Sequence, residues 1–305
     1  MFVLIFNQLV KMLFIMILAF LCYRFKIINQ EGNRNLSSLL LTIVNPCLII
    51  TVFQTEYDSS LVYGLLLSFA AATAAHLIAI AAAHFLIHGK NNPDFEIDRF
   101  AAAYSNCGFI GIPLVNSVLG AKGVFFLTAY MTVFNVLSWT HGLVLLEGRF
   151  SLKKLKEGLM TPIVVCTFIG VFLFFLQLRI PTPLLDSMNY IADMNTPLAM
   201  MIAGLSVAQA DLKKIFSHMR IYWVSFLKLF IVPLAVLVFL ALLPLDREVA
   251  YTNLIASACP TATTLTIMCI RFKRNYTYAS EIFSFTTVLS VITIPIITFI
   301  ADFVL

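Results

Sequence analysis

Charged residues are scarce in this sequence: Asp, Glu, Lys and Arg make up 11% of its 305 residues, against 61% for hydrophobic residues. A water-soluble domain carries about 25% charged residues because its surface must be solvated. The shortage excludes a soluble globular protein and predicts a chain that lies in a lipid bilayer. The net charge of +5 comes from basic residues between apolar runs. Such residues act as topology signals, so we expect no nucleic-acid partner.

The sequence also lacks the patterns of metal centres, disulfide frameworks and intramembrane proteases. Its cysteines lie in or beside apolar runs without metal-ligand spacing, and we expect them to be packing residues: Cys22, Cys47, Cys107, Cys166, Cys259 and Cys269. His84 and His88 lack the intervening Glu of a zinc-protease motif, and Asp193 has no aspartate partner. We therefore expect no enzyme activity and no metal or other cofactor. The N-terminus shows neither a basic leader nor a small-residue cleavage site, so the first apolar run is expected to remain as a span.

Apolar runs of about 20 residues predict an all-α polytopic membrane protein with ten transmembrane helices. The expected spans are 3–23, 36–55, 61–87, 99–119, 123–146, 159–178, 184–207, 221–243, 248–270 and 276–301. The first, third, fifth, seventh and ninth connections hold fifteen Lys and Arg residues, and the other four hold three. Cytoplasmic loops retain an excess of positive charge. We therefore expect a multi-pass protein of the plasma membrane with both termini on the non-cytoplasmic side.

Two similar motifs, about half the chain apart, indicate an internal repeat. Ala-Tyr-Ser-Asn106 precedes Pro113 by the same spacing at which Ala-Tyr-Thr-Asn253 precedes Pro260. These motifs make span 4 correspond to span 9.

A weaker pair makes span 2 correspond to span 7, because Asn45-Pro46 is matched by Asn195-Thr-Pro197. Each half holds an odd number of spans, so the halves are predicted to be inverted repeats. They cover residues 1–146 and 159–305, and residues 147–158 form a short cytoplasmic linker.

Spans 4 and 9 contain residues that interrupt helices. Gly108, Gly111 and Pro113 predict a break near the middle of span 4, and Pro260 predicts one in span 9. Freed backbone groups are tolerated at membrane depth only beside protein or a wet cavity, so two broken helices are expected to cross near the midplane. Simple kinking is the alternative.

Such a crossing offers donors to a small anion. Half-helix N-termini carry unpaired N–H groups, and the amides of Asn106 and Asn253 can donate to a carboxylate. Thr261, Thr263 and Thr264 are expected to add hydroxyl donors, the alternative being that each bonds to its own helix backbone. The predicted substrate-binding set is Asn106, Gly108, Gly111, Pro113, Asn253, Pro260, Thr261, Thr263 and Thr264.

These motifs resemble the auxin efflux carrier family, which includes plant auxin exporters and bacterial malonate or malate permease-like members. The matching segments occur in the expected order along the chain: Asn45-Pro46, Asn106 to Pro113, Asn195 to Gly204, and Cys-Pro-Thr-Ala around Pro260. The chain lacks the long cytoplasmic loop of the plant exporters, which favours a bacterial or other short-loop member.

The resemblance implies ten spans in two inverted five-span repeats, with the substrate at the crossing. Spans 1, 2, 6 and 7 would form a scaffold that dimerises, and spans 3–5 and 8–10 a mobile transport unit. Asn45, Pro46, Asn195 and Pro197 would then lie on the scaffold side of the site.

Ionisable residues inside spans are candidates for ion coupling because burying charge in a membrane is costly. Asp193 could bind H⁺ or Na⁺, although it could equally be a carboxylate facing a wet cavity. Lys228 and Glu281 could pair across spans 8 and 10, with a lysine that reaches for the interface as the alternative.

The sequence thus predicts a secondary active transporter for a small organic anion that works by alternating access. The anion would be a mono- or dicarboxylate such as malonate or malate, or an auxin-like compound. The expected partners are this anion, the lipid bilayer and a second copy of the chain. The main alternative is a sodium-coupled symporter or a cation/proton antiporter of related fold; a channel or a membrane-embedded enzyme is less favoured.

Overall fold

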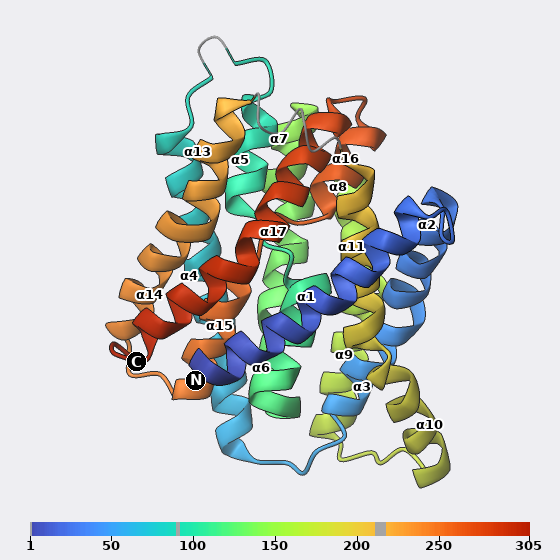
Figure 1. Cartoon of the computed structure of the whole chain (residues 1–305). Coiled ribbons are helices and arrows are strands. Elements are labelled where there is room, and N and C mark those ends of the chain that lie inside the picture. Colours follow the sequence, from blue (N-terminus) through green and yellow to red (C-terminus); the bar gives the residue numbers. More distant parts are fainter. Residues whose placement is uncertain (1, 90–91, 211–217) are drawn as a thin grey trace.

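A computed structural model describes residues 2–89, 92–210 and 218–305, and its regular elements in these ranges are all helices (Figure 1). The predicted all-α architecture is confirmed to that extent. Three of the basic residues counted as topology signals, Lys90, Lys213 and Lys214, lie outside the described residues.

Several helices contain a wider π-helical turn, labelled η. The first half of the chain contains α1 (Phe2–Arg24), α2 (Gln30–Leu39), η1 (Leu40–Val44), α3 (Asn45–Val52), α4 (Ser59–Leu86), α5 (Phe95–Ala103), η2 (Cys107–Gly111), α6 (Ile112–Leu137), η3 (Ser138–Gly142) and α7 (Leu143–Glu147). The second half contains α8 (Leu152–Leu159), α9 (Pro162–Phe175), α10 (Thr182–Asp193), α11 (Asn195–Gln209), α13 (Met219–Phe226), η4 (Leu227–Ile231), α14 (Val232–Ala241), α15 (Arg247–Ala258), α16 (Thr264–Arg271) and α17 (Tyr276–Ala301).

Seven helices in the described ranges are long and apolar enough to cross a membrane, and an eighth is added if α8 and α9, bent by 57°, form one span. The count falls short of ten for two structural reasons. The predicted spans 4 and 9 are each divided by a break, and the second part of span 4 runs on into span 5 within the 41 residues Cys107–Glu147. Gly120, with φ of 65° and ψ of −161°, is not helical and separates this run into two helices.

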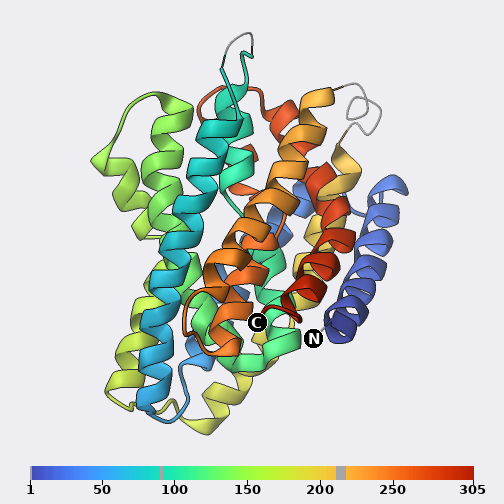
Figure 2. The same cartoon turned by 90° about the vertical axis from the view of Figure 1, so that its left-hand side faces the viewer.

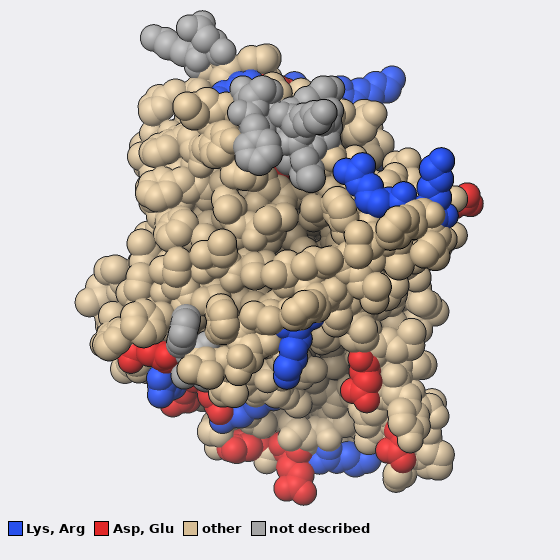
Figure 3. Space-filling view, in the orientation of Figure 1, with Lys and Arg blue, Asp and Glu red and all other residues tan. Residues whose placement is uncertain are grey.

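The two ends of the molecule differ from its middle in charge. Charged side chains gather along the upper and lower edges of the face in Figure 3, and an almost uncharged belt lies between them. The upper end in Figure 1 contains the start of α2, the ends of α7 and α16, and α8. We call it the basic end, because Lys154 of α8 and Arg271 of α16 lie there. Both termini lie in the half of the molecule away from the basic end (Figures 1 and 2).

Ion pairs at the basic end hold α8, in the segment that joins the two halves of the chain, against its neighbours. Arg271, at the end of α16, contacts Glu157 of α8 at 2.7 Å, and Lys154 of α8 contacts Glu147. At the opposite end, Asp58 caps α4 by accepting from the Ser60 N–H at 2.8 Å. Hydrogen bonds from the Ser60 hydroxyl and N–H lower the pKa of Asp58.

Buried residues are concentrated in α6 and α15, which lie in the middle of the bundle. Every residue from Val249 to Ala258 of α15 is buried, as expected for a helix surrounded by protein on all sides. α15 packs against α4, α6 and α14, and α1 crosses α11 on the outside (Figure 1). The two divided helices therefore lie where protein, rather than lipid, surrounds their free backbone groups.

Candidate site at the crossing of two divided helices

The breaks in the two divided helices meet and hydrogen-bond to each other. Residues 104–106 follow α5, and residues 259–263 separate α15 from α16. Ser105 and Thr261 form an antiparallel bridge. The Asn106 N–H donates to the Pro260 carbonyl at 2.7 Å, and the Ala262 N–H donates to the Tyr104 carbonyl at 3.0 Å. The predicted crossing of two broken helices is thus present in the structure.

Local sequence explains why the backbone of span 9 loses its helical hydrogen bonds at the break. Pro260 has no N–H to donate, and proline keeps the preceding residue out of the helical region; Cys259 is accordingly extended, with ψ of 150°. Unpaired backbone groups at this depth are costly. The short antiparallel contact between the breaks pairs two N–H groups with two carbonyls and removes part of that cost.

The break in span 4 lies earlier than predicted. The helix stops after Ala103, before Gly108, Gly111 and Pro113, and η2 begins at Cys107. Pro113 lies in the first turn of α6, where a π turn precedes it and the helix continues. A π turn shifts the hydrogen-bond register by one residue, so the missing proline donor is tolerated without a break.

A cavity of about 190 Å³ lies beside the crossing, and we call it the crossover pocket. Its polar lining residues come from four segments of the chain: Ser105, Asn106, Asn135, Thr161, Thr263 and Thr264. Gly108 lines it with backbone alone. Met131, Phe134, Trp139 and Ile163 contribute apolar surface. An apolar pocket with a few convergent polar groups is the usual form of a small-molecule site.

Two fully buried side-chain polar atoms at the crossover pocket have no hydrogen-bond partner among the described residues. Asn106 is 3% exposed; its Oδ1 accepts from the Phe109 N–H, while its Nδ2 is buried and unpartnered. The Thr161 hydroxyl is likewise buried and unpartnered. A buried donor without a partner costs stability, so its presence in a pocket points to a ligand that supplies an acceptor. A carboxylate oxygen would do so.

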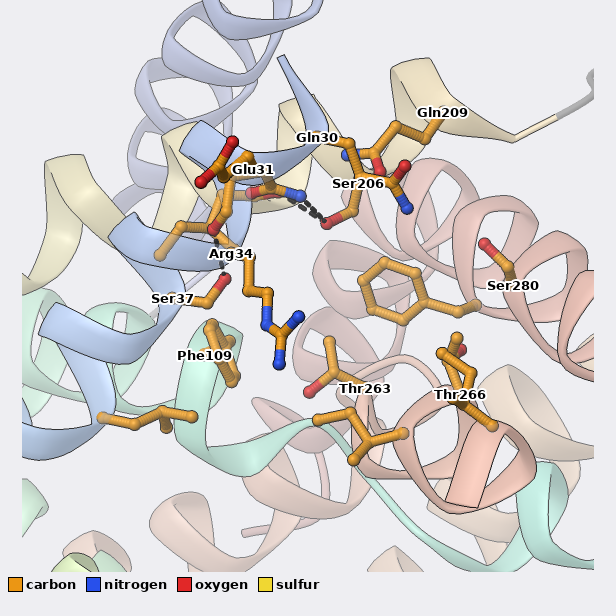
Figure 4. Close-up of a pocket in the computed structure, with 16 residues that line it drawn as sticks. Gln30, Glu31, Arg34, Ser37, Phe109, Ser206, Gln209, Thr263, Thr266 and Ser280 are labelled. Atoms are coloured by element: carbon orange, nitrogen blue, oxygen red, sulfur yellow. Dashed lines mark hydrogen bonds between the residues drawn. The ribbon is translucent and has the colours of Figure 1, made fainter. Parts of the chain in front are cut away.

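A larger cavity of about 850 Å³ adjoins the crossover pocket, and we call it the vestibule (Figure 4). α2, α11, α16 and α17 contribute to its wall. Leu41, Phe109, Thr263 and Ile267 line both cavities. The two cavities therefore share a wall, and a solute in the vestibule is separated from the crossover pocket by these side chains.

Lys228 lies behind the crossing and joins the two divided helices. Its side chain is fully buried in η4. Nζ donates to the Ser105 hydroxyl at 2.5 Å and to the Ser257 carbonyl at 3.2 Å. The Ser105 hydroxyl in turn donates to the same carbonyl at 3.1 Å. The predicted pairing of Lys228 with Glu281 is therefore replaced by contacts with the two divided helices.

Asn253 is a predicted binding residue that the structure does not bring to either cavity. Its Nδ2 donates to the Ser68 hydroxyl and to the Val249 carbonyl, both at 2.9 Å. The two asparagines of the repeated motif differ in position because the two breaks fall at different places in the motif. The break in span 4 includes Asn106, whereas the break in span 9 is at Pro260 and leaves Asn253 inside α15.

The remaining residues of the predicted binding set support the crossing from within. The Thr261 hydroxyl donates to the Ala101 carbonyl at 3.0 Å, in the other divided helix and not in its own. Gly111 packs against Cys259 at the end of α15. Thr261, Gly111, Pro113 and Pro260 hold the geometry but do not line the crossover pocket.

The two asparagines predicted on the scaffold side contact each other. Asn195 Nδ2 donates to Asn45 Oδ1 at 2.7 Å, and both side chains are buried. Pro46 lies in the first turn of α3 and Pro197 in the first turn of α11. None of these four residues lines either cavity.

The two carboxylates predicted for ion coupling lie away from both cavities. Asp193 is exposed at the end of α10, and Glu281 is 2% exposed on α17. Neither lines the vestibule or the crossover pocket.

Six polar or aromatic residues of the crossover pocket were missed by sequence reasoning: Ser105, Phe109, Phe134, Asn135, Trp139 and Thr161. A signal existed for Ser105, which lies inside the repeated motif next to Asn106. It also existed for Thr161, which precedes Pro162 at the start of α9. Asn135 and Trp139 come from the end of α6 and from η3. Only tertiary packing brings them to the crossing.

Two comparisons with known proteins bear on the role of this site. The sequence matches the family described as membrane transport protein, the auxin efflux carrier family, over residues 4–151 and 149–298. It is also 27% identical over 208 residues to a protein of Rhizobium meliloti (strain 1021) named "Putative malonate transporter". That match covers 64% of this chain and 63% of the relative, so it spans less than two thirds of the relative's length.

Proposed function

This chain belongs to the membrane transport protein family, and on that premise we propose that it is a secondary carrier for a small organic anion. The observation that carries the proposal is the buried, unpartnered Nδ2 of Asn106 in a cavity beside the crossing. A neutral amide donor and a neighbouring hydroxyl suit the oxygens of a carboxylate.

Malonate or a similar short dicarboxylate is the substrate class that we infer. The crossover pocket, at about 190 Å³, suits a compact solute, and the relative from Rhizobium meliloti carries the name of a malonate transporter. Transport would proceed by alternating access, with the vestibule as the route from the basic end to the crossing.

We infer that the chain forms ten spans in two inverted repeats, 1–146 and 159–305, joined by residues 147–158. Two contacts between the halves support this. The breaks pair through Ser105 and Thr261, and Asn45 bonds to its repeat counterpart Asn195 at 2.7 Å. A residue near a pseudo-twofold axis meets its own counterpart, so the asparagine pair is the contact expected at such an axis.

The first prediction tests Asn106 by thermal stabilisation of the purified protein in detergent. Malonate should raise the apparent melting temperature of the wild type, because a ligand that binds only the folded state stabilises it. Asn106→Ala should abolish this shift. The panel also contains malate, acetate, indole-acetate and sodium chloride, and a shift with sodium alone would favour the sodium-coupled alternative.

Asn253→Ala is the matched control, since it removes the same amide from a buried asparagine outside both cavities. It should lower the melting temperature without ligand, because the bond to Ser68 is lost, and should keep the malonate shift. Equal loss of the shift in both variants, or a full shift in Asn106→Ala, would contradict the assignment of the crossover pocket.

A further inference from the structure

Arg34 is the one cationic side chain among the described residues that line the vestibule. Figure 4 shows its guanidinium reaching from α2 into the cavity, towards Phe109 and Thr263. The carboxylate of Glu31, which also lines the cavity, points the other way in this view. The basic residue was expected only to orient the chain in the membrane, yet its charged group occupies the space in front of the shared wall.

The guanidinium has no hydrogen-bond or ion-pair partner within the described ranges. Its polar neighbours are engaged elsewhere: the Ser37 hydroxyl donates to the Asn33 carbonyl at 2.8 Å, and the Ser206 hydroxyl to the Ile202 carbonyl at 2.8 Å. Gln209 Nε2 donates to the Leu205 carbonyl at 3.0 Å. The five N–H donors of Arg34 and its charge are therefore available to a solute in the vestibule.

The charge of Arg34 lies in the vestibule, in front of the wall that the vestibule shares with the crossover pocket. Phe109 and Thr263, towards which the guanidinium points, are two of the residues that line both cavities. Beyond them, the polar groups of the crossover pocket are neutral amides and hydroxyls. An anion that approaches from the basic end thus meets a full positive charge first and uncharged donors second.

We propose that Arg34 forms a capture site for a carboxylate of the substrate in the vestibule, before the substrate reaches the crossover pocket. The inference rests on the proposed function, because it assigns Arg34 to the same transported anion. A guanidinium binds a carboxylate through two parallel N–H···O bonds, which provides orientation as well as attraction. A dicarboxylate held in this way keeps its second carboxylate free to advance to Asn106.

Binding of radiolabelled malonate to the full-length protein in detergent tests the proposal, with both ends of the molecule accessible. Arg34→Gln should raise the Kd about tenfold at low ionic strength, the loss expected for a charge-assisted hydrogen bond. The difference should shrink in high salt, where an exposed charge is screened. Arg34→Lys keeps the charge without the planar fork and should recover part of the affinity.

Arg24→Gln is the matched control. It removes the same charge from the same connection, but Arg24 lies over the Phe20 ring, at 5.2 Å, and does not line the vestibule. Wild-type affinity in Arg24→Gln together with the loss in Arg34→Gln would support the capture site. Wild-type affinity in Arg34→Gln, or an equal loss in both variants, would overturn it.

Inorganic sulfate separates failure of this inference from failure of the proposed function. If the wild type binds none of the carboxylates, the proposed function is wrong. The anion site in the vestibule is then tested by sulfate, which should stabilise the wild type and Arg24→Gln against heat but not Arg34→Gln. Equal stabilisation of all three proteins would overturn the assignment of Arg34.

Discussion

At the scale of single residues, two basic side chains have surroundings that differ from those expected from the sequence. Lys228 is fully buried and bonds to Ser105 and Ser257, whereas Arg34 extends into a cavity. The desolvation free energy lost on burying an ammonium group is about as large as the free energy gained from its new hydrogen bonds. Such a contact therefore adds little net stability. Its value is to fix the relative position of the groups it joins. We therefore assign Lys228 to holding the crossing in place.

Lys228→Met tests that role. The apolar side chain of similar volume should leave the melting temperature nearly unchanged, because both the desolvation cost and the hydrogen bonds are removed. Malonate uptake into proteoliposomes should fall at least about tenfold, as expected when binding groups are displaced by as little as about 1 Å. Lys11→Met, a lysine on α1 that lines neither cavity, is the control. Wild-type uptake by Lys228→Met would refute a positioning role.

At the scale of helices, the sequence predicts that prolines disturb helices but not how. Pro46, Pro113 and Pro233 each lie two residues after the end of a π turn, in the first turn of the next helix, which continues without a break. Pro260 instead ends one divided helix, and the other divided helix has its break well before Pro113. Whether a freed carbonyl is accommodated by a π turn or by a facing segment depends on what packs against it. That information is not local to the sequence.

The packing of α1 against α11 gives a prediction at the same scale. A Cβ placed on Gly204 would lie 2.1 Å from the Met16 backbone carbonyl oxygen, so the two helix backbones are in direct contact. Gly204→Ala must push the helices apart, and overpacking of this kind costs about 1–3 kcal/mol. We expect its melting temperature to drop by several degrees in a thermal unfolding assay.

Gly108→Ala is the control for that drop, because the nearest atom to its added Cβ is 4.0 Å away, on Ile163. It should unfold close to the wild-type temperature and, since Gly108 lines the crossover pocket, should weaken malonate binding. The two substitutions thus distinguish an effect on helix packing from an effect on malonate binding in the crossover pocket. Equal stability of Gly204→Ala and the wild type would show that α1 can move away from α11 at little cost.

At the scale of the whole molecule, the sequence predicted an all-helical chain with several apolar helices long enough to cross a membrane, because the signals for these features are long and additive. Apolar runs are repeated along the whole chain, and basic residues gather in alternate connections. The vestibule could not be predicted in this way. Its wall combines α2, α11, α16 and α17, which lie far apart in the chain. The sequence marks Arg34 as basic, and only the assembled helices show that its charge faces a cavity.

The sidedness of the molecule gives the last prediction. If the basic end is cytoplasmic, a membrane-impermeant maleimide applied to intact cells should label Asp186→Cys, on the exposed surface of α10 at the opposite end, but not Lys153→Cys on α8. Both thiols should react once the cells are permeabilised, which controls for their reactivity. The native cysteines are buried or half-buried and should give little background. Labelling of Lys153→Cys alone in intact cells would show that the orientation in the membrane is the opposite one. The vestibule would then open to the outside, and Arg34 would capture anions for entry into the cell from there.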